Sequence, residues 1–255
     1  MKKGKRLLWG YIDTSGQYVI EPRYDDAWNF SEGLAVIKID WKRGYIDRSG
    51  REVIEPQFQN ADGFSEGLAR VMLDDKWGYI NSEGQYAIAP VYDKAGNFSE
   101  GMAKVAIGGK YGFINRDGGY VIAPAYDYAD DFSGDKARVM TDGRWIYIDR
   151  QGGEIARAPA YVPQDMSTPE FHDGLAPLRT ADKVGYIDES GNFVISPVFT
   201  EAEPFCEGYA RVRYGVRSKW CFIETSGRPA FKAKFTQAED FHDGLARVLA
   251  ETDDA

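Results

Sequence analysis

The 255-residue sequence has few of the residues that build disulfide frameworks and metal sites, with two cysteines and two histidines. Cys206 and Cys221 stand at repeat positions where other copies carry Ser and Gly, so we interpret them as substitutions rather than as a disulfide or a metal site. His172 and His242 replace the serine of one recurring turn, and no cysteine or third histidine stands at ligand spacing from them. The sequence therefore predicts no metal and no cofactor.

Long hydrophobic runs are also missing. No segment approaches the roughly 18 apolar residues of a membrane-spanning helix, and the basic stretch from Met1 to Leu8 leads into no signal-peptide pattern. We therefore expect a cytoplasmic protein.

Positive charge is in deficit, because 31 Lys and Arg face 40 Asp and Glu for a net charge of -9. Nucleic acids and anionic membranes both need a basic surface. The expected partner is another protein, basic or neutral, with no nucleic acid and no membrane, and we expect a monomer.

Catalytic motifs are missing as well: the sequence has no nucleophile elbow, phosphate loop or zinc-binding helix motif. An active site is a single constellation, whereas the polar residues here recur in nearly every copy of a repeat. We expect that the protein is not an enzyme and has no catalytic residues.

What the chain does contain is one phrase, clearest from Asp75 to Val105 and repeated from end to end. Its Trp-Gly step recurs every 34 residues four times, then after 39 and 36; the glycine position is filled by Gly10, Gly44, Gly78, Gly112, Ile146, Gly185 and Cys221. The copies start near residues 9, 43, 77, 111, 145, 184 and 220. We expect a single repeat domain over 1–255.

Each copy alternates apolar and polar residues with a period of two, which is typical of β-strands. Residues 68–73 form a first predicted strand and 77–80 a second, whose glycine lets a neighbouring backbone approach closely. A hairpin turn is predicted over 81–84.

A third strand follows that turn, and we expect proline to end it because proline cannot donate to a ladder. The prolines at this position are Pro22, Pro56, Pro90, Pro124 and Pro197. The next piece, such as 92–98, is either a short fourth strand or an ordered loop. An irregular loop is predicted over 153–170, where the pattern loosens.

Units this small cannot bury their own apolar faces, so they must stack on one another. The chain begins with the Trp-Gly strand of the first unit and ends with the strand 244–250, which would complete that unit. This offset favours an all-β array closed as a seven-bladed β-propeller, with an open β-solenoid of stacked hairpins as the alternative.

The repeated phrase resembles the bacterial WG repeat proteins, whose consensus is similar to K-W-G-Y-I-D-x-x-G-x-x-V-I-x-P-x-Y-D-x-A-x-x-F-S-E-G-L-A-x-V. The match runs from Trp9 to Val248 and departs at Ile146, at Cys221 and in the fifth unit. The resemblance implies β-rich repeats that bind other proteins, and it carries over no catalytic residue.

One position predicts a binding feature: the residue between Ala and Val of the first strand is a cation in five of seven copies. These candidate binding residues are Arg70, Lys104, Arg138, Arg211 and Arg247. Aligned, they could grip a carboxylate-bearing partner. The alternative is that each pairs with a nearby carboxylate as an ordinary surface ion pair.

Two other recurring sets have a structural and a binding interpretation. The acids of the F-S-E-G motif could ring a cation, but we favour hydrogen bonds to turn amides; they are Glu32, Glu66, Glu100, Asp173, Glu207 and Asp243. The aromatic residues at the Trp and Tyr positions of Trp-Gly-Tyr could stack on sugars, but we favour a place in the core between units.

The sequence thus predicts a non-enzymatic protein-binding scaffold that presents a loop face to a macromolecular partner. A specific version is an acidic inhibitor or immunity protein that covers a basic toxin or enzyme. A lectin-like carbohydrate-binding module is the alternative.

Overall fold

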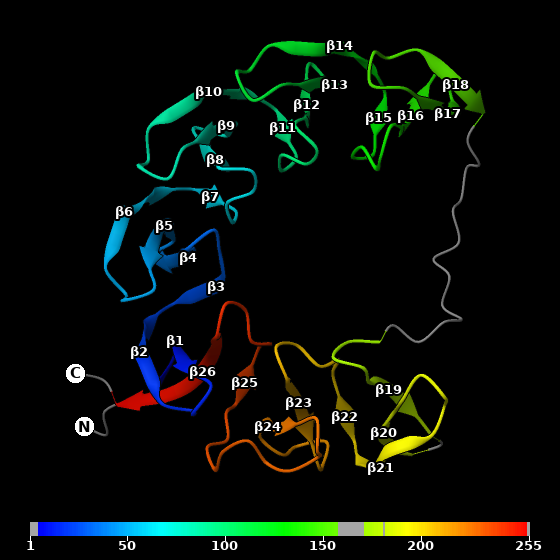
Figure 1. The fold of residues 1–255 in the computed structure, drawn as a ribbon. Coiled ribbons are helices and arrows are strands. Elements are labelled where there is room, and N and C mark those ends of the chain that lie inside the picture. The colour runs from blue at the N-terminus through cyan, green and yellow to red at the C-terminus, as the bar shows by residue number, and fades with distance from the viewer. Residues whose placement is uncertain (1–4, 158–170, 181, 254–255) are drawn as a thin grey trace. The chain divides into compact units, whose positions relative to one another are not determined.

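The computed structural model describes residues 5–157, 171–180 and 182–253, and its regular structure in these ranges is all β, without a helix. The strands form seven sheets (Figure 1). The chain divides into two compact units. Unit 1 comprises Met1–Phe30, Arg48–Gly50 and Asp165–Ala255, and unit 2 comprises Ser31–Asp47 and Arg51–Gln164. A single repeat domain over 1–255 stays a prediction.

Four sheets follow one another along the chain, each with its strands in sequence order and antiparallel. The first is β3-β4-β5-β6, formed by Asp26–Ser31, Leu34–Ile39, Lys42–Asp47 and Glu52–Phe58. The second is β7-β8-β9-β10, formed by Asn60–Ala61, Ala69–Leu73, Lys76–Ile80 and Tyr86–Tyr92. The third is β11-β12-β13-β14, formed by Lys94–Ala95, Ala103–Ile107, Lys110–Ile114 and Tyr120–Tyr126. The fourth is β15-β16-β17-β18, formed by Tyr128–Ala129, Ala137–Thr141, Arg144–Ile148 and Glu154–Arg157.

The remaining three sheets belong to unit 1. Two have three described strands: β19-β20-β21, formed by Ala176–Arg179, Val184–Ile187 and Phe193–Phe199, and β22-β23-β24, formed by Glu201–Ala202, Tyr209–Arg213 and Cys221–Glu224. The last is β2-β1-β26-β25, formed by Tyr18–Tyr24, Lys5–Asp13, Leu245–Asp253 and Gln237–Ala238.

That last sheet joins segments from the beginning and the end of the chain. β1 and β26 pair antiparallel in unbroken register from Lys5 opposite Asp253 to Asp13 opposite Leu245. The segment predicted over 244–250 therefore does complete the first repeat, and its strand continues to Asp253. Sharing a sheet between early and late segments in this way is the arrangement that the propeller hypothesis predicts.

The described residues show whether the piece after the third strand is a strand or a loop, and they test the predicted hairpin turn. The fourth strand exists and is only two residues long in most sheets, as in β7 and β11. The predicted turn over 81–84 is confirmed, because the Gly84 amide donates to the Asn81 carbonyl at 2.9 Å and the Asn81 side chain accepts from the Gln85 amide at 2.9 Å. Gly84 has a φ of 81°, which glycine adopts without strain.

The Trp-Gly glycine is needed for a close approach of two backbones. A Cβ built on Gly78 would lie 2.6 Å from the Ile88 carbonyl oxygen and 2.6 Å from the Pro90 nitrogen. There Trp77 pairs with Tyr92 and Tyr79 pairs with Ile88, so two steps along β9 match four along β10. The proline strand bulges directly over the glycine.

The prediction that proline ends the third strand is wrong. β2, β6, β10, β14 and β21 each continue two residues past their proline. These strands are outermost in their sheets, and the proline lies in the bulge, where no ladder bond is required of it.

The described residues of the two copies that lack the glycine pair differently at this point. Where Ile146 replaces it, β18 pairs with β17 without a skip at that residue, Ile146 opposite Arg157 and Tyr147 opposite Ala156, and the register shifts only between Tyr147 and Ile148. Residues 154–157 of the predicted irregular loop are therefore a strand, and residues 158–170 lie outside the described residues. Where Cys221 replaces the glycine, β24 keeps only isolated bridges on that side, such as Ile223 with Pro229.

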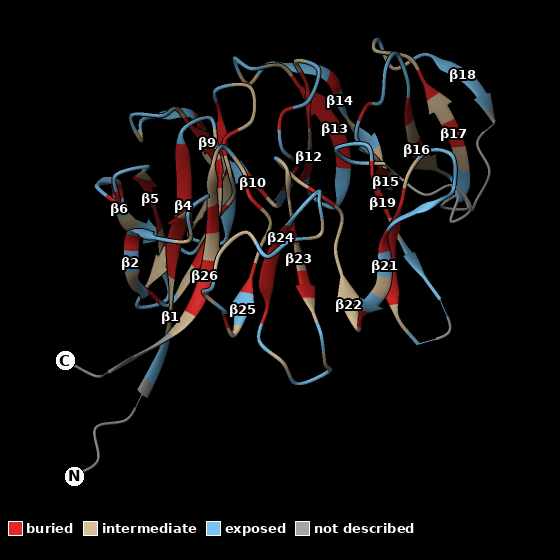
Figure 2. Ribbon diagram, turned by 60° about the horizontal axis from the view of Figure 1, so that its bottom comes forward, coloured by how far each residue is buried: buried red, intermediate tan, exposed pale blue. Residues whose placement is uncertain are grey.

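Buried residues lie along the strands of the sheets (Figure 2), and one aromatic pair recurs in this core between neighbouring sheets. The ring of the Trp-Gly-Tyr motif meets the phenylalanine of the next F-S-E-G at 4.8–5.1 Å between centroids; the pairs are Tyr11–Phe30, Tyr45–Phe64, Tyr79–Phe98, Phe113–Phe132, Tyr186–Phe205 and Phe222–Phe241. All these rings are buried. The predicted place of this aromatic position in the core between units is confirmed for these six copies.

The buried tyrosine hydroxyls donate across the same boundary. Tyr45 donates to the Asp62 carbonyl at 2.8 Å and Tyr79 donates to the Gly96 carbonyl at 2.7 Å; Tyr11 and Tyr186 do the same with Trp28 and Glu203. Burial raises the pKa of each of these four phenols far above the usual value of 10.

We expect Gly78→Ala to lower the free energy of unfolding by about 1–3 kcal/mol, because the new methyl group must displace the β10 backbone. Gly215→Ala is the matched control, since its Cβ would meet nothing closer than 3.9 Å, and its effect should stay within about 0.5 kcal/mol. Urea-unfolding midpoints measure both. Equal midpoints for the two variants would contradict the close approach.

The buried tyrosines also predict a loss of stability at alkaline pH. Below pH 10 they are neutral in both the folded and the unfolded chain; above it the unfolded chain alone releases their protons, so the free energy of unfolding falls by up to about 1.4 kcal/mol per pH unit for each tyrosine. Tyr45→Phe should be less stable at pH 8 by about 1 kcal/mol for the lost hydrogen bond. It should also lose stability less steeply between pH 10 and 11, whereas Tyr120→Phe, at an exposed position, should follow the parent protein. Urea midpoints across this range test the difference in slope.

Candidate functional site

All five candidate cations are half-buried, with side chains 16–28% exposed, and each lies beside a carboxylate. The pairs are Arg70–Asp62, Lys104–Asp131 at 3.2 Å, Arg138–Asp130 at 2.8 Å, Arg211–Asp240 at 2.8 Å and Arg247–Asp26 at 3.8 Å. The structure therefore shows the ion pairing of the alternative interpretation. Whether these cations bind a partner stays a prediction.

Three of the arginines do more than form ion pairs, because they also tie one repeat to the next. Arg211 donates from Nη1 to the Ala238 carbonyl at 2.6 Å, and Arg70 and Arg247 donate in the same way to Ala95 and Ala27. The accepting alanine precedes the F-S-E-G phenylalanine by three residues in every case. A guanidinium can satisfy a carboxylate and a carbonyl together because it has five N–H donors.

The Trp-Gly tryptophan lies against these guanidinium groups. The Cζ atoms of Arg138 and Arg247 are 4.3 Å and 4.7 Å from the ring centroids of Trp145 and Trp9. Arg70 and Arg211 lie over Trp77 and Trp220 in the same way. The guanidinium groups therefore cover part of each indole face that solvent would otherwise reach.

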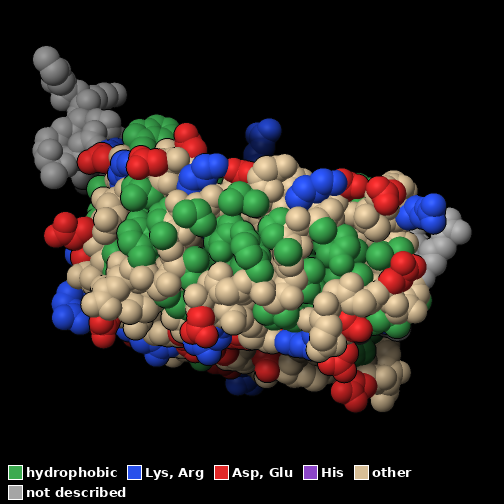
Figure 3. All heavy atoms as spheres, turned by 90° about the horizontal axis from the view of Figure 1, so that it is seen from above, with side chains coloured by type: hydrophobic (Ala, Val, Ile, Leu, Met, Phe, Trp, Pro, Cys, Tyr) green, Lys and Arg blue, Asp and Glu red, His purple; other side chains and the backbone are tan. Residues whose placement is uncertain are grey.

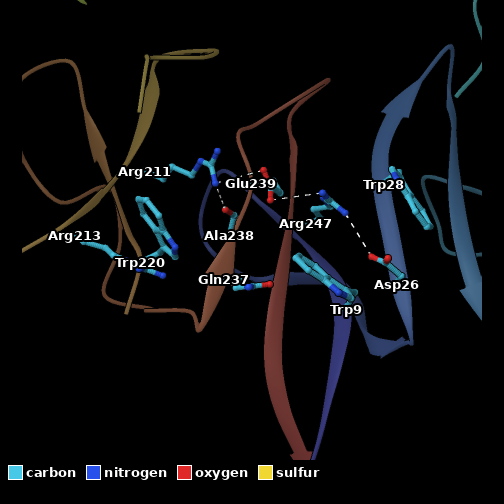
Figure 4. A pocket seen from close by; sticks show the side chains of 10 residues that line it. All are labelled: Trp9, Asp26, Trp28, Arg211, Arg213, Trp220, Gln237, Ala238, Glu239 and Arg247. Carbon is cyan, nitrogen blue, oxygen red and sulfur yellow. Dashed lines mark hydrogen bonds and ion pairs between the residues drawn. The ribbon is translucent and has the colours of Figure 1, made fainter. Parts of the chain in front are cut away.

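The structure brings the candidate cations together in two cavities, one in each unit. The unit 1 cavity, of about 360 Å³, is lined by Arg211 and Arg247 (Figure 4); with them stand Trp9, Asp26, Trp28, Arg213, Trp220, Gln237, Ala238 and Glu239. The unit 2 cavity, of about 250 Å³, is lined by Arg70, Trp77, Lys94, Ala95, Lys104 and Tyr111. Arg138 lines neither of them.

The two cavities occupy equivalent positions in the repeat. Arg70, Trp77, Ala95, Lys104 and Tyr111 of one correspond to Arg211, Trp220, Ala238, Arg247 and Trp9 of the other. The flanks of the alanine differ, however: Lys94 and Gly96 stand where the unit 1 cavity has Gln237 and Glu239. The same repeat structure thus presents a different set of polar side chains in each of the two cavities.

A third equivalent position is filled by a side chain. Tyr128 stands where Lys94 and Gln237 stand in the two cavities, and its ring contacts Tyr111 at 5.5 Å and Trp145 at 5.6 Å between centroids. The residue before the alanine is different in each of the six described copies: Asp26, Asn60, Lys94, Tyr128, Glu201 and Gln237. At these three positions a different residue stands before the alanine: Lys94 and Gln237 line a cavity, and Tyr128 packs against two neighbouring rings.

The F-S-E-G acids bind the next turn. The Glu66 carboxylate accepts from the Gly101 amide at 3.0 Å, 35 residues along the chain, and Glu32, Glu100, Asp173 and Glu207 bind Gly67, Gly134, Gly208 and Gly244 in the same way. Each of these acids except Asp243 is thus paired to a turn amide, as predicted; Asp243 pairs with Arg48 at 3.3 Å. Within the described residues, no group of three or more His, Cys, Asp or Glu side chains gathers as a metal site.

The histidines and one cysteine fill the serine position of those turns. His172 and His242 bridge to Leu175 and Leu245 as Ser65 bridges to Leu68. The Cys206 thiol lies 2.9 Å from the Phe241 carbonyl, where Ser65 Oγ donates to the Phe98 carbonyl at 2.7 Å. Cys206 and Cys221 are both free thiols, and burial raises the pKa of each.

Sequence reasoning missed Arg213, Trp28 and Glu239, which line the unit 1 cavity. Arg213 is two residues from Arg211 on the same strand face, and its Cζ lies 4.3 Å from the Trp220 ring centroid. The signal that could have found the other two is the variation around the alanine, since these positions change from copy to copy in an otherwise regular repeat.

Repeated sheets of four antiparallel strands, with the first and last segments sharing a sheet, define an all-β repeat protein of the β-propeller type. The chain belongs to the WG containing repeat family, whose model matches residues 9–42, 44–77, 77–111, 111–145, 185–220 and 220–249. The fifth predicted unit, with its lost glycine at Ile146, is not among the matched segments.

Solved structures similar to this chain include a eukaryotic initiation factor, at 11% identity over 96% of this chain and 98% of that chain, with a TM-score of 0.51. Virginiamycin B lyase from Staphylococcus aureus is similar at 13% identity over 96% of this chain and 99% of that one, with a TM-score of 0.38. The likeness to the initiation factor concerns the fold alone. No curated protein matches the sequence. Among the described residues, none lies in a helix that could cross a membrane.

We expect Glu66→Ala to expose the Gly101 amide, because the carboxylate that accepts its hydrogen bond is removed. Amide hydrogen exchange at Gly101 should become at least about tenfold faster, corresponding to about 1.4 kcal/mol of lost protection. The Gly208 amide, which Asp173 holds, is the internal control and should keep its rate. An unchanged rate at Gly101 would show that the bond between turns does not protect it.

Proposed function

We propose that this protein is a non-enzymatic scaffold that binds another protein. The repeat frame supports this proposal, because the recurring polar groups of the motif are engaged between neighbouring repeats. Binding then depends on residues that the frame leaves exposed.

The observation that carries the proposal is a set of exposed apolar side chains on the outermost strands of unit 2. On β10, Tyr86 and Val91 are 44% and 47% exposed, and on β14, Tyr120 and Val121 are 48% and 42% exposed. Figure 3 shows a band of hydrophobic side chains on the face of the molecule where β10 and β14 lie. Grouped apolar side chains on a surface are typical of protein-binding sites.

The strands that carry this band are outer edges, but their bulged prolines make them poor templates for a further strand. Pro90 and Pro124 interrupt the row of amides on β10 and β14. We therefore propose that the partner contacts the band through side chains rather than by extending the sheet.

Charge supports a further part of the proposal. The net charge of -9 suits a basic or neutral partner, and a specific form of the hypothesis is an inhibitor or immunity protein that covers a basic enzyme or toxin. The cations of the unit 2 cavity, Lys94 among them, would take an acidic side chain of such a partner.

We expect Tyr120→Lys with Val121→Lys to abolish capture of a stoichiometric partner, because charged side chains would replace the apolar contact. The immobilised full chain is incubated with a lysate of its source cells, and the bound proteins are identified by mass spectrometry and then tested in purified form. Val216→Lys is the matched control, since Val216 is 76% exposed in a turn of unit 1, away from these strands in sequence. Lys94→Glu tests the cavity cations separately and should weaken the same partner about tenfold.

Equal capture by the band variant and the parent protein would overturn the proposed surface. Turnover of a small molecule by the purified chain, lost in a variant of either cavity, would overturn the non-enzymatic assignment.

A further inference from the structure

The unit 1 cavity contains a row of alternating donors and acceptors that are loosely paired. Glu239 lies 3.4 Å from Arg211 and 3.6 Å from Arg247, and Arg247 lies 3.8 Å from Asp26 (Figure 4). Charge-assisted hydrogen bonds are normally about 2.7–2.9 Å long. These three contacts are therefore ion pairs whose hydrogen-bonding capacity is partly unused.

Two buried donors in the same cavity have no partner at all. The Nε atoms of Arg213 and Arg247 are shielded from solvent and make no hydrogen bond within the described residues. A buried N–H without an acceptor costs about 1–3 kcal/mol, and such groups are few in folded proteins. Both atoms belong to side chains that line the cavity, but the atoms themselves are shielded from it, so the donors that can meet a ligand are the Nη atoms.

Three indole side chains line this cavity. Trp220 is buried, and Trp9 and Trp28 are half-buried. Arg247 lies over Trp9, and Arg211 and Arg213 lie over Trp220, so the apolar contact with a ligand depends on Trp28. Trp28 comes from β3, whereas Trp9 comes from β1, so the aromatic wall spans two different sheets of the fold.

The lining carries charges of both signs, so it favours no ligand of a single charge. An anion would meet Glu239 and Asp26, and a cation would meet three guanidinium groups. A neutral molecule with neighbouring hydroxyl groups fits both, because each hydroxyl accepts from a guanidinium and donates to a carboxylate. A sugar has such hydroxyls on its edges and apolar C–H groups on its faces.

We propose that the unit 1 cavity binds a neutral saccharide. Its hydroxyl groups bridge the row from Arg211 to Asp26, and a C–H face lies against the Trp28 indole. The volume of about 360 Å³ lies within the range of about 300–1,000 Å³ that small-ligand sites occupy.

The unit 2 cavity provides the contrast within the same chain. Gly96 stands there in place of Glu239, and Lys94 stands in place of Gln237. Its lining contains cations and aromatic rings but no carboxylate and no amide side chain. The repeat frame alone therefore does not predict saccharide binding; the variable residues beside the alanine do.

The test uses the purified full chain titrated with glucose, galactose, mannose and N-acetylglucosamine, and with their methyl glycosides as probes for a chain-linked sugar. Isothermal calorimetry measures affinity, and tryptophan fluorescence reports on the indoles. At least one neutral sugar should bind with a Kd of about 1 mM or tighter. If only the free sugar binds, the reducing end enters the cavity; if the methyl glycoside binds as well, a glycan chain can be held.

Trp28→Ala and Glu239→Ala should each weaken that affinity about tenfold or more. Trp28→Phe keeps an aromatic face and should retain most of the binding, which separates stacking from a folding defect. Trp77→Ala in the unit 2 cavity is the matched control and should leave the affinity unchanged. Thermal unfolding of each variant shows whether it is folded.

The proposal is overturned if no sugar or methyl glycoside binds at about 10 mM. It is also overturned if binding survives both cavity variants, or if sodium acetate or tetramethylammonium chloride occupies the cavity in place of a sugar. Loss of partner capture in the band variant does not bear on this result, because the two sets of residues are distinct.

Discussion

The fold is stable because each repeat covers the apolar face of the neighbouring sheet. No sheet of three or four short strands is stable alone. Across each described boundary a Tyr or Phe ring meets the next phenylalanine, and the tyrosine hydroxyl donates to a carbonyl on the other side. Because these bonds leave no buried polar group unpaired at that point, the aromatic pair can be fully desolvated. The regular spacing of the repeat follows from this one geometric requirement.

The recurring polar residues serve the same purpose near the surface. The carboxylate of Glu66 and the guanidinium of Arg70 each bind backbone of the following repeat, at Gly101 and at Ala95. These residues recur along the chain because they bind the backbone of the following repeat. The residues beside the alanine differ from copy to copy: Asp62 and Asp130 pair with the arginine of the frame, whereas Lys94 and Glu239 line the two cavities. A repeat of this kind separates its frame from its recognition residues.

Much of the fold could be predicted from the sequence because the period, the turn glycines and the alternation within each unit are local signals. The course of the third strand could not, since the continuation past Pro90 depends on a bulge that faces Gly78 across the sheet. The strand at Glu154–Arg157 was likewise missed, because its pairing uses Ile146 where other copies have glycine. At the candidate site, Arg70 and Arg211 were found as a periodic set. Their stacking on tryptophan and the loose contacts of Glu239 were not, because both depend on side-chain distances between repeats.

The pairing of β1 with β26 has a consequence for how the protein is made. Trp9 leaves the ribosome early, but its neighbour Leu249 follows 240 residues later (249 minus 9). At about 5–20 residues per second, β1 waits on the order of 10–50 s with an uncovered edge. Closing so distant a contact is slow, and an unpaired strand is an aggregation hazard in the meantime. In the nascent chain the edge of β1 that pairs with β26 therefore stays open until β26 has been made.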